Sequence, residues 1–159
     1  MTLLNWFRPK NPVLAEAVPR DAAALANLHG ASFRRGWSED EFERLLLERN
    51  VVTHRAMIGR QLVGFVVSRL APPEAEILSI AVASSQRGRG LARALLDLHL
   101  RRPVGLGTRT VFLEVDENNT PARRLYRRMG FGDAGRRERY YQQGAAPAAA
   151  ALVLRRDVA

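Results

Sequence analysis

An apolar run, a glycine turn and an amphipathic segment follow one another in the middle of the chain. The run Ile77–Val82 is rich in β-branched residues, which is typical of a buried strand. Polar and glycine residues occupy 84–90. Leu91, Leu95 and Leu98 then recur at i, i+4 and i+7, so they share one face of a predicted helix. The pattern predicts a strand, a tight turn and a helix N-terminus in direct succession.

The same periodicities, read together with turn and capping signals, divide the rest of the chain. Ser38 and Glu41 form an S-x-x-E capping box at the start of a helix, Pro103 is expected to end a later helix, and Gly130 suits the position just after another. Asp21 is expected to cap the first helix. Strands are predicted at 13–18, 51–58, 61–70, 74–82, 110–115, 133–141 and 151–156, and helices at 22–33, 38–50, 91–103 and 120–129, with a low-complexity loop at 144–151.

The predicted order β-α-α-β-β-β-α-β-α-β-β indicates an α/β fold with a mixed central sheet and helices on both faces. Strands joined by a helical crossover, the fourth to the fifth and the fifth to the sixth, are expected to pair in parallel. The hairpin at 51–70 makes the other end of the sheet antiparallel. We expect 1–11 to form a short irregular arm and 12–159 to form one domain.

Composition limits the classes of protein that fit. The chain has no cysteine, so neither a disulfide framework nor a thiol nucleophile is available. His29, His54 and His99 stand apart and lack the spacing of metal ligands, which favours packing or surface roles and predicts no metal. No apolar run approaches the ~20 residues of a membrane-spanning helix, and 1–11 does not resemble a signal peptide. These features predict a soluble, cytoplasmic protein without a membrane partner.

The formal net charge of +9 has two possible meanings. It can reflect a nucleic-acid or ribosomal partner, or it can be compositional bias, because Lys10 is the only lysine and arginine is scattered along the chain. The scatter favours bias, so direct nucleic-acid binding is not expected. A basic surface would still attract an anionic cofactor.

The turn Arg87-Gly88-Arg89-Gly90 has the features of an anion cradle. The first amides of a helix lack intrahelical partners and lie at the positive end of its dipole, and glycine lets a ligand approach the backbone. Neither a Walker A loop nor G-x-G-x-x-G is present. The alternative is a tight turn that needs glycine for its shape alone.

Two other residues could carry acid–base chemistry. Glu114 lies within an otherwise apolar strand, where a carboxylate is either functional or on the solvent face. Tyr126 lies on the apolar face of the following helix, and a phenol can protonate a departing thiolate if it is not simply a core residue. The pattern leaves both alternatives open.

The spacing of these segments adds a family resemblance. Residues 87–92 fit R/Q-x-x-G-x-G/A, which resembles the acetyl-CoA motif of the GNAT N-acetyltransferases. The segments A-E-I-L-S-I-A-V, F-L-E-V-x-x-x-N and R-L-Y-x-x-M-G-F follow the order of the ribosomal-protein alanine N-acetyltransferases within that family. Gly36-Trp37-Ser38-Glu39 resembles their P-W-S-E segment, and the stretch 137–141 resembles their R-x-Y-Y ending. The resemblance covers about 13–157 and implies a single GNAT-like domain.

The resemblance implies direct transfer of an acetyl group from acetyl-CoA to the N-terminal amine, expected to be alanine, of a small-subunit ribosomal protein with a basic N-terminus. Glu114 would be the general base and Tyr126 the general acid. Ile80, Ala81 and Val82 would bind the pantetheine arm, Arg87, Gly88, Arg89, Gly90, Leu91 and Ala92 the pyrophosphate, and Asn119 the cofactor arm. The acceptor would contact Trp37, Glu39, Ser79, Tyr140 and Tyr141.

Two departures concern the acceptor side. Gly36 replaces a proline, and Ala145–Ala151 replaces an acidic segment. A GNAT enzyme acting on a small amine or on lysine, and an arginine-rich RNA- or ribosome-binding module without catalysis, are the alternatives. Salt-sensitive RNA binding without acetyl-CoA binding would favour the module.

Overall fold

The computed structural model describes residues 11–139 and 148–158. In this part of the chain seven strands form one mixed sheet in the order β1-β2-β3-β4-β5-β7-β6. The strands are β1 (Val13–Glu16), β2 (Val51–Ile58), β3 (Gln61–Ala71), β4 (Glu74–Val82), β5 (Thr110–Asp116), β6 (Gly132–Arg139) and β7 (Ala148–Asp157). The helices are α1 (Ala22–Ser32), α2 (Glu39–Leu47), α3 (Leu91–Gly105) and α4 (Thr120–Arg128), with short 3-10 turns η2 (Pro19–Asp21) and η3 (Ser84–Gln86).

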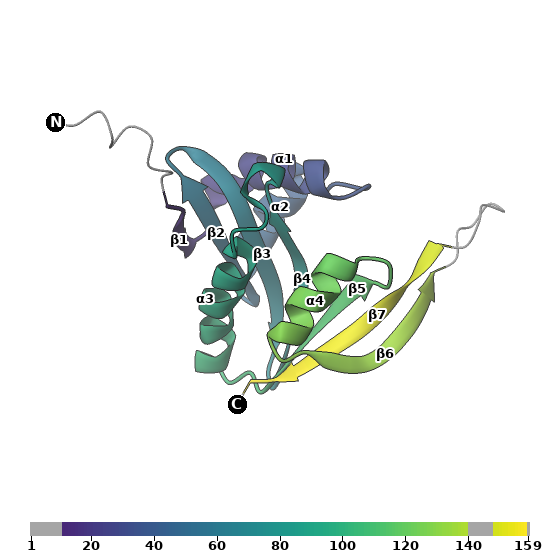
Figure 1. Cartoon of the computed structure of the whole chain (residues 1–159). Helices are drawn as coiled ribbons and strands as arrows, with labels where there is room; N and C mark the ends of the chain where they lie inside the picture. The colour runs from purple at the N-terminus through teal and green to yellow at the C-terminus, as the bar shows by residue number, and fades with distance from the viewer. Residues whose placement is uncertain (1–10, 140–147, 159) are drawn as a thin grey trace, which may run out of the picture.

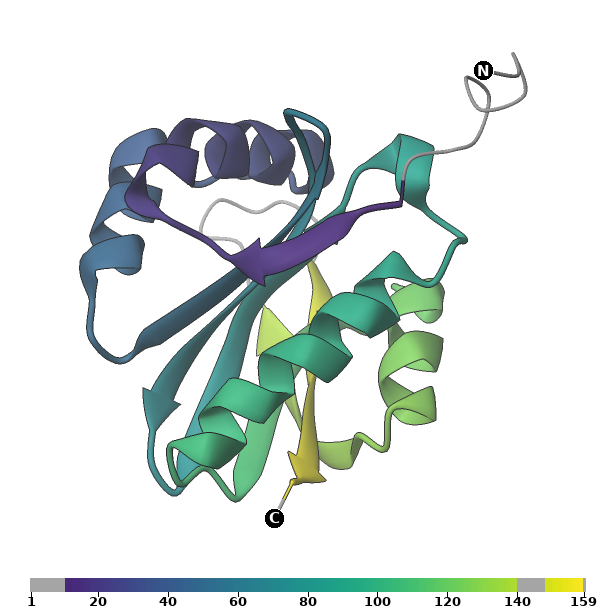
Figure 2. The same cartoon turned by 90° about the vertical axis from the view of Figure 1, so that its left-hand side faces the viewer.

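The helices form two layers, one on each face of the sheet (Figures 1 and 2). Leu95, Tyr126 and their neighbours on α3 and α4 pack into one hydrophobic cluster with inward residues of β2 to β5 and of β7. Leu25 of α1 and Phe42 of α2 pack into a second cluster around Phe65 of β3. The predicted mixed α/β sheet with helices on both faces is therefore confirmed.

Local capping and turn signals are confirmed at three places. Ser38 caps α2, with Glu41 N–H donating to Ser38 Oγ at 3.1 Å and Ser38 N–H donating to Glu41 Oε2 at 2.9 Å. The β2–β3 hairpin turns at Gly59, whose φ of 61° is left-handed. Gly130, with φ of 88°, follows α4 as predicted.

The predicted pairing of the strand around 133–141 is wrong. β4 and β5 pair in parallel as expected, but β7 lies between β5 and β6 and is antiparallel to both. β6 and β7 are consecutive and pair as antiparallel neighbours. The apolar residues Leu152 and Leu154 of β7 then pack on the core, while the charged segment Arg136–Glu138 lies on the edge strand.

Pro103 does not end α3, which continues to Gly105. Proline costs the helix one backbone hydrogen bond, but Pro103 lies in the last turns and is buried, and Leu106 N–H donates to the carbonyl of Pro103 at 3.0 Å. The predicted leucine face is also shifted, because Leu98 is only partly buried while Leu96 and His99 are buried.

Several predicted ends move. β1 stops at Glu16 because Pro19 opens a 3-10 turn, and α2 stops at Leu47 because the chain turns at Glu48 into β2. β7 starts at Ala148, so part of the predicted loop is strand, whose Ala151 pairs with both Asp116 and Arg137.

Asp21 is the N-cap residue of α1 by position, but its side chain does not cap the helix. Its carboxylate instead accepts from Val18 N–H at 2.8 Å and pairs with Arg55 of β2. The cap prediction was therefore wrong about the role of the side chain, which fastens η2 to the sheet.

The three histidines are packing residues, as predicted. His99 of α3 is fully buried, with its Nδ1 2.8 Å from Nδ1 of His54 on β2 and its Nε2 2.7 Å from Oγ of Ser68 on β3. This chain of polar side chains connects α3 to two strands. Burial, and then the neighbouring His54, lower the pKa of His99 to about 3.

Candidate active site

The glycine turn between β4 and α3 has left-handed backbone at two positions. Gly88 and Gly90 both have φ of 76°, a conformation that side chains with a Cβ rarely adopt. A Cβ at either position would meet no atom within 4 Å. Glycine is therefore needed here for backbone shape, and the space above the turn is open.

The turn leaves the N-terminus of α3 exposed. Gly90 is the N-cap residue and, having no side chain, gives the first amides of the helix no side-chain acceptor. Nε of Arg87 donates to the carbonyl of Val82 at 3.1 Å, which ties the turn to the end of β4. The predicted anion cradle depends on such an open helix N-terminus, and anion binding itself stays a prediction.

A gap opens between β4 and β5 beside this turn. The two strands pair only from Glu74 with Thr110 to Ile77 with Leu113. β4 continues to Val82, still paired with β3, so the edge of residues 78–82 that faces β5 has no strand partner among the described residues. Backbone N–H and C=O groups on that edge are available to a ligand. Ile80, Ala81 and Val82, for which cofactor contacts are predicted, belong to this segment.

A bulge in β4 accompanies the gap. Val67 pairs with Ser79 and Ser68 pairs with Ile77, which leaves Leu78 as an extra residue. The bulge changes which side chains face each layer, since Ile77 and Ile80 pack toward α3 and α4 while Leu78 and Ala81 pack toward α1 and α2.

Glu114 projects from β5 on the face opposite to α3 and α4. Its neighbours Leu113 and Val115 are buried in the α3 and α4 cluster, and side chains alternate along a strand. The Glu114 side chain is 29% exposed, and its Oε1 lies 2.9 Å from Nη1 of Arg137 on β6. The sequence left open whether Glu114 is a functional carboxylate or lies on the solvent face. The structure shows a partly exposed carboxylate that is paired with an arginine.

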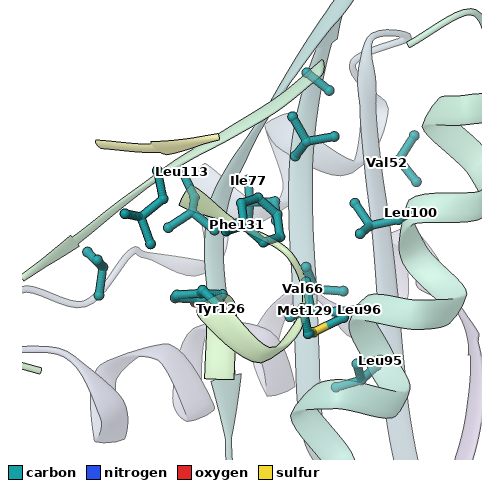
Figure 3. Packing of buried hydrophobic residues seen from close by; sticks show 14 of the residues in the cluster. Val52, Val66, Ile77, Leu95, Leu96, Leu100, Leu113, Tyr126, Met129 and Phe131 are labelled. Carbon is teal, nitrogen blue, oxygen red and sulfur yellow. The ribbon is translucent and has the colours of Figure 1, made fainter. Parts of the chain in front are cut away.

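Tyr126 lies on the other face, in the α3 and α4 cluster (Figure 3). Its ring packs 5.9 Å from that of Phe131, edge to face, and only 5% of the residue is exposed. Burial raises the pKa of Tyr126 to about 12, so the phenol stays protonated at neutral pH. Glu114 and Tyr126 therefore lie on opposite faces of the sheet.

A cavity of about 340 Å³ lies on the α1 and α2 face. Trp37 borders it, and its indole stacks on His29 with ring centres 4.5 Å apart. Nδ1 of His29 accepts from the backbone N–H of Trp37 at 3.0 Å, which fixes the loop before α2. Burial lowers the pKa of His29, and Glu41 raises it to a smaller extent. The cavity is lined by Trp37, Glu41, Arg44, Leu45, Glu48, Arg69 and Leu78.

Of the predicted acceptor residues that the structure describes, only Trp37 lines the cavity. Trp37 borders the cavity, Ser79 is buried beside Leu78, and Glu39 is exposed in the first turn of α2. Tyr140 and Tyr141 lie outside the described residues.

The residues predicted to bind the cofactor lie around α3 and α4. Asn119 caps α4, with its Oδ1 accepting from Ala122 N–H at 3.2 Å. Leu91 and Ala92 pack at the start of α3, while Arg89 donates to Gln86 at 3.4 Å.

Sequence reasoning missed Arg137 as a partner of Glu114 and Leu78 as part of the cavity. Neither carries a local signal, because both depend on the order of β5, β7 and β6 and on the bulge in β4. Among the residues that the structure describes, no helix is long and apolar enough to cross a membrane.

Comparison with known proteins assigns the class. Residues 22–131 match the acetyltransferase (GNAT) family. This match covers more than half of the chain, so the chain belongs to the GNAT family and is an acyltransferase.

Its relatives include named enzymes. It is 37% identical to the N-alpha-acetyltransferase RimI of Mycobacterium tuberculosis, over 92% of this chain and 93% of that protein. It is 32% identical to the [ribosomal protein bS18]-alanine N-acetyltransferase of Escherichia coli, over 66% of this chain and 70% of that protein. An uncharacterized protein of Mycobacterium leprae is 35% identical over 91% of this chain, which spans only 40% of that longer protein.

Solved structures show the same fold. The ribosomal-protein-S18-alanine N-acetyltransferase of Escherichia coli superposes with a TM-score of 0.82 at 23% identity, over 92% of this chain and 94% of that chain. Arabidopsis thaliana NAA60 in complex with acetyl-CoA gives a TM-score of 0.81 at 22% identity, over 92% and 98% of the two chains.

Proposed function

We propose that this protein transfers the acetyl group of acetyl-CoA to the N-terminal α-amine, an alanine, of a ribosomal protein. The observation that supports this most strongly is the gap between β4 and β5, which lies beside the glycine turn and has Glu114 and Tyr126 on opposite faces. The names of relatives from Mycobacterium tuberculosis and Escherichia coli support the acceptor.

The cofactor would approach from the α3 and α4 face. Its pyrophosphate would bind the amides of residues 88–92 at the α3 N-terminus, with Arg87 and Arg89 beside it. The pantetheine arm would run along the unpaired edge formed by Ile80–Val82 and hydrogen bond to its backbone. Asn119 uses its carbonyl oxygen as a cap, so its side-chain amide would be the group that donates to the cofactor arm.

The acceptor would approach from the α1 and α2 face. Trp37 and Leu78 border the cavity on this face, and Glu114 projects on the same side. Glu39 and Ser79 would contact the first residues of the acceptor, with Tyr140 and Tyr141 beyond the described part of β6. The acids of α2 suit a cationic peptide, and the arginines of the glycine turn suit an anionic cofactor.

In the reaction the amine nitrogen attacks the thioester carbonyl carbon, and the C–S bond breaks. Glu114 accepts the proton that the amine loses, through a water molecule. Tyr126 gives its proton to the departing thiolate. An α-amine with a pKa of about 7.7–8.0 loses its proton near neutral pH far more easily than lysine at about 10.4, which favours an N-terminus as acceptor.

The high pKa of Tyr126 has two consequences for this role. The phenol is always protonated and ready to donate, but it is a weaker acid than an ordinary thiol with a pKa of about 8.5. The same burial disfavours the free thiolate and raises its pKa, which reduces the mismatch between the two groups. Proton transfer from Tyr126 would therefore be coupled to cleavage of the C–S bond.

The test is a series of acceptor peptides that differ only in the first residue. We expect the highest kcat/KM for alanine, a lower value for serine, and a value at least about tenfold lower for leucine or lysine, because the Escherichia coli relative is named for an alanine acceptor. Equal kcat/KM across the series would contradict the assigned acceptor while leaving acetyltransfer intact. Trp37→Ala should reduce the discrimination.

A further inference from the structure

The two helical layers carry opposite charge. α1 and α2 together contain four acids and one arginine, whereas α3 and α4 contain seven arginines and the single acid Asp97. Figure 2 shows α3 and α4 on the same face of the sheet. Seven of the chain's 24 arginines therefore lie on the two helices that cover one face of the sheet.

The part of this side that is farthest from the glycine turn is strongly basic. Arg101 and Arg102 lie in the last turns of α3, and Arg127 and Arg128 lie in the last turn of α4. Arg156 of β7 reaches the same end, because its side chain passes within 3.7 Å of where a Cβ of Gly130 would stand. We call these five residues the basic end.

Cofactor binding does not account for the basic end. α3 rises about 1.5 Å per residue, so Arg102 lies about 16 Å along the helix from Leu91 and the phosphate cradle. Arg101, Arg102 and Arg128 are exposed, and within the described residues no ion pair neutralises them. Arg127 has only the exposed Asp133 at 3.6 Å, a pair of little energetic value.

Helix stability explains the basic end only in part. Cations are favourable in the last turn of a helix. However, Arg127 and Arg128 also face Arg123 and Arg124 at i−4, and like charges at this spacing are unfavourable. α4 therefore carries more positive charge than its own stability favours, which is expected at a functional surface.

We infer that the basic end is a docking surface for RNA phosphates. Through it the enzyme reaches an acceptor protein that is bound to ribosomal RNA. The inference rests on the proposed ribosomal-protein acceptor. The guanidinium group binds phosphate oxygens in a bidentate manner, and the basic end consists of arginine alone. The surface lies on the face opposite to the acceptor cavity, so RNA can bind while a protein N-terminus enters the site.

The test measures binding of a fluorescein-labelled 20-nucleotide single-stranded RNA by fluorescence anisotropy at several salt concentrations. Arg101→Gln with Arg128→Gln removes one arginine from each helix of the basic end. Arg20→Gln with Arg49→Gln removes the same charge beside α1 and α2, where both side chains are also exposed. Each phosphate contact contributes about 0.7 to the slope of log Kd against log salt. We expect the first pair to lower this slope by about 1.4 and to weaken binding about tenfold, and the second pair to leave both unchanged.

Three results would overturn the inference. Equal losses in the two double variants would mean that RNA responds to net charge alone. Displacement of RNA by polyglutamate at equal charge would mean that the surface fits an acidic protein, and displacement by saturating acetyl-CoA would assign the arginines to the cofactor. Acetylation of a free peptide, measured beside these assays, should be normal in both variants. If the unmodified enzyme does not acetylate the peptide, the proposed function is contradicted, while the RNA-binding result still stands by itself.

Discussion

Nη1 of Arg137 lies 2.9 Å from Oε1 of Glu114, across the intervening strand β7. An incoming α-ammonium group must therefore compete with this guanidinium for the carboxylate. The Arg137 side chain is 71% exposed on the edge strand and is free to move away. Arg137 is thus a candidate determinant of acceptor affinity.

Arg137→Gln should lower the KM of the acceptor peptide about two- to fivefold, as expected when an exposed ion pair of ~0.2–1 kcal/mol no longer competes. The effect should diminish at high salt. Arg136→Gln is the matched control, since the neighbouring Arg136 pairs with Glu117 at 3.0 Å instead. A higher KM for Arg137→Gln would mean that the guanidinium binds the acceptor rather than excluding it.

Gly90→Ala should weaken acetyl-CoA binding beyond its effect on stability. Alanine in left-handed backbone costs about 1–2 kcal/mol, and the turn would shift to relieve that strain. Gly59→Ala in the β2–β3 hairpin provides the control, because its φ is also positive at 61° and its Cβ also meets nothing within 4 Å. Calorimetric Kd values and thermal melts should show similar losses of stability but a loss of cofactor affinity in Gly90→Ala alone. Equal Kd values in the two variants would argue against the cradle.

Glu114→Gln and Tyr126→Phe should each lower kcat by ~10²–10⁴, with cofactor affinity nearly unchanged. Because the pKa of Tyr126 is about 12, the phenol does not titrate below about pH 11, so any basic limb of the kcat profile in this range must come from another group. Pre-steady-state rates should be used, so that product release does not hide the chemical step. Rates equal to those of the unmodified enzyme would remove both roles.

The buried histidine chain predicts a loss of stability in acid. Unfolded His99 takes up a proton near pH 6.5, whereas folded His99 does so only near 3. The unfolded state therefore binds more protons between these values, so stability is complete above pH 6.5 and decreases as the pH falls below it. Burial also lowers the pKa of His54, so His54 acts in the same direction. Glu16 raises that pKa and Arg102 lowers it further.

For His99 alone the loss between pH 6.5 and 5 is roughly 2 kcal/mol. Urea unfolding at pH 5 and pH 8 should show this difference in the unmodified protein and a smaller one in His99→Gln. Glutamine retains polar atoms near Ser68 and His54 but does not titrate. The same pH difference in both proteins would exclude His99 as its source.

Local sequence signals predicted the elements that depend on near neighbours. The capping box of Ser38 and Glu41, the turn at Gly59 and the glycine turn before α3 all rest on residues within a few positions. The position of β7 depends on which edge of β5 remains free, and the bulge at Leu78 depends on register with β3. Neither leaves a mark in the nearby sequence.

The site shows the same division. The glycine turn was recognisable from one contiguous segment, while the surroundings of Glu114 required the positions of β6 and β7. Strand alternation gave Glu114 two possible faces, but the partner Arg137 lies 23 positions along the chain. The cavity on the α1 and α2 face is lined by side chains from α2, β3 and β4 and by Trp37, so a local signal could single out Trp37 but not Leu78.

The most direct test of the central claim is the position of the acetyl group on a peptide that begins with alanine and contains one internal lysine. Enzyme, acetyl-CoA and peptide are incubated near neutral pH, and fragmentation by mass spectrometry locates the modification. We predict acetylation of the α-amine alone, and no product when that amine is already blocked. Acetylation of the lysine would contradict an N-terminal acetyltransferase. Equal acetylation of the peptide with a free α-amine and the peptide with a blocked one would contradict it as well.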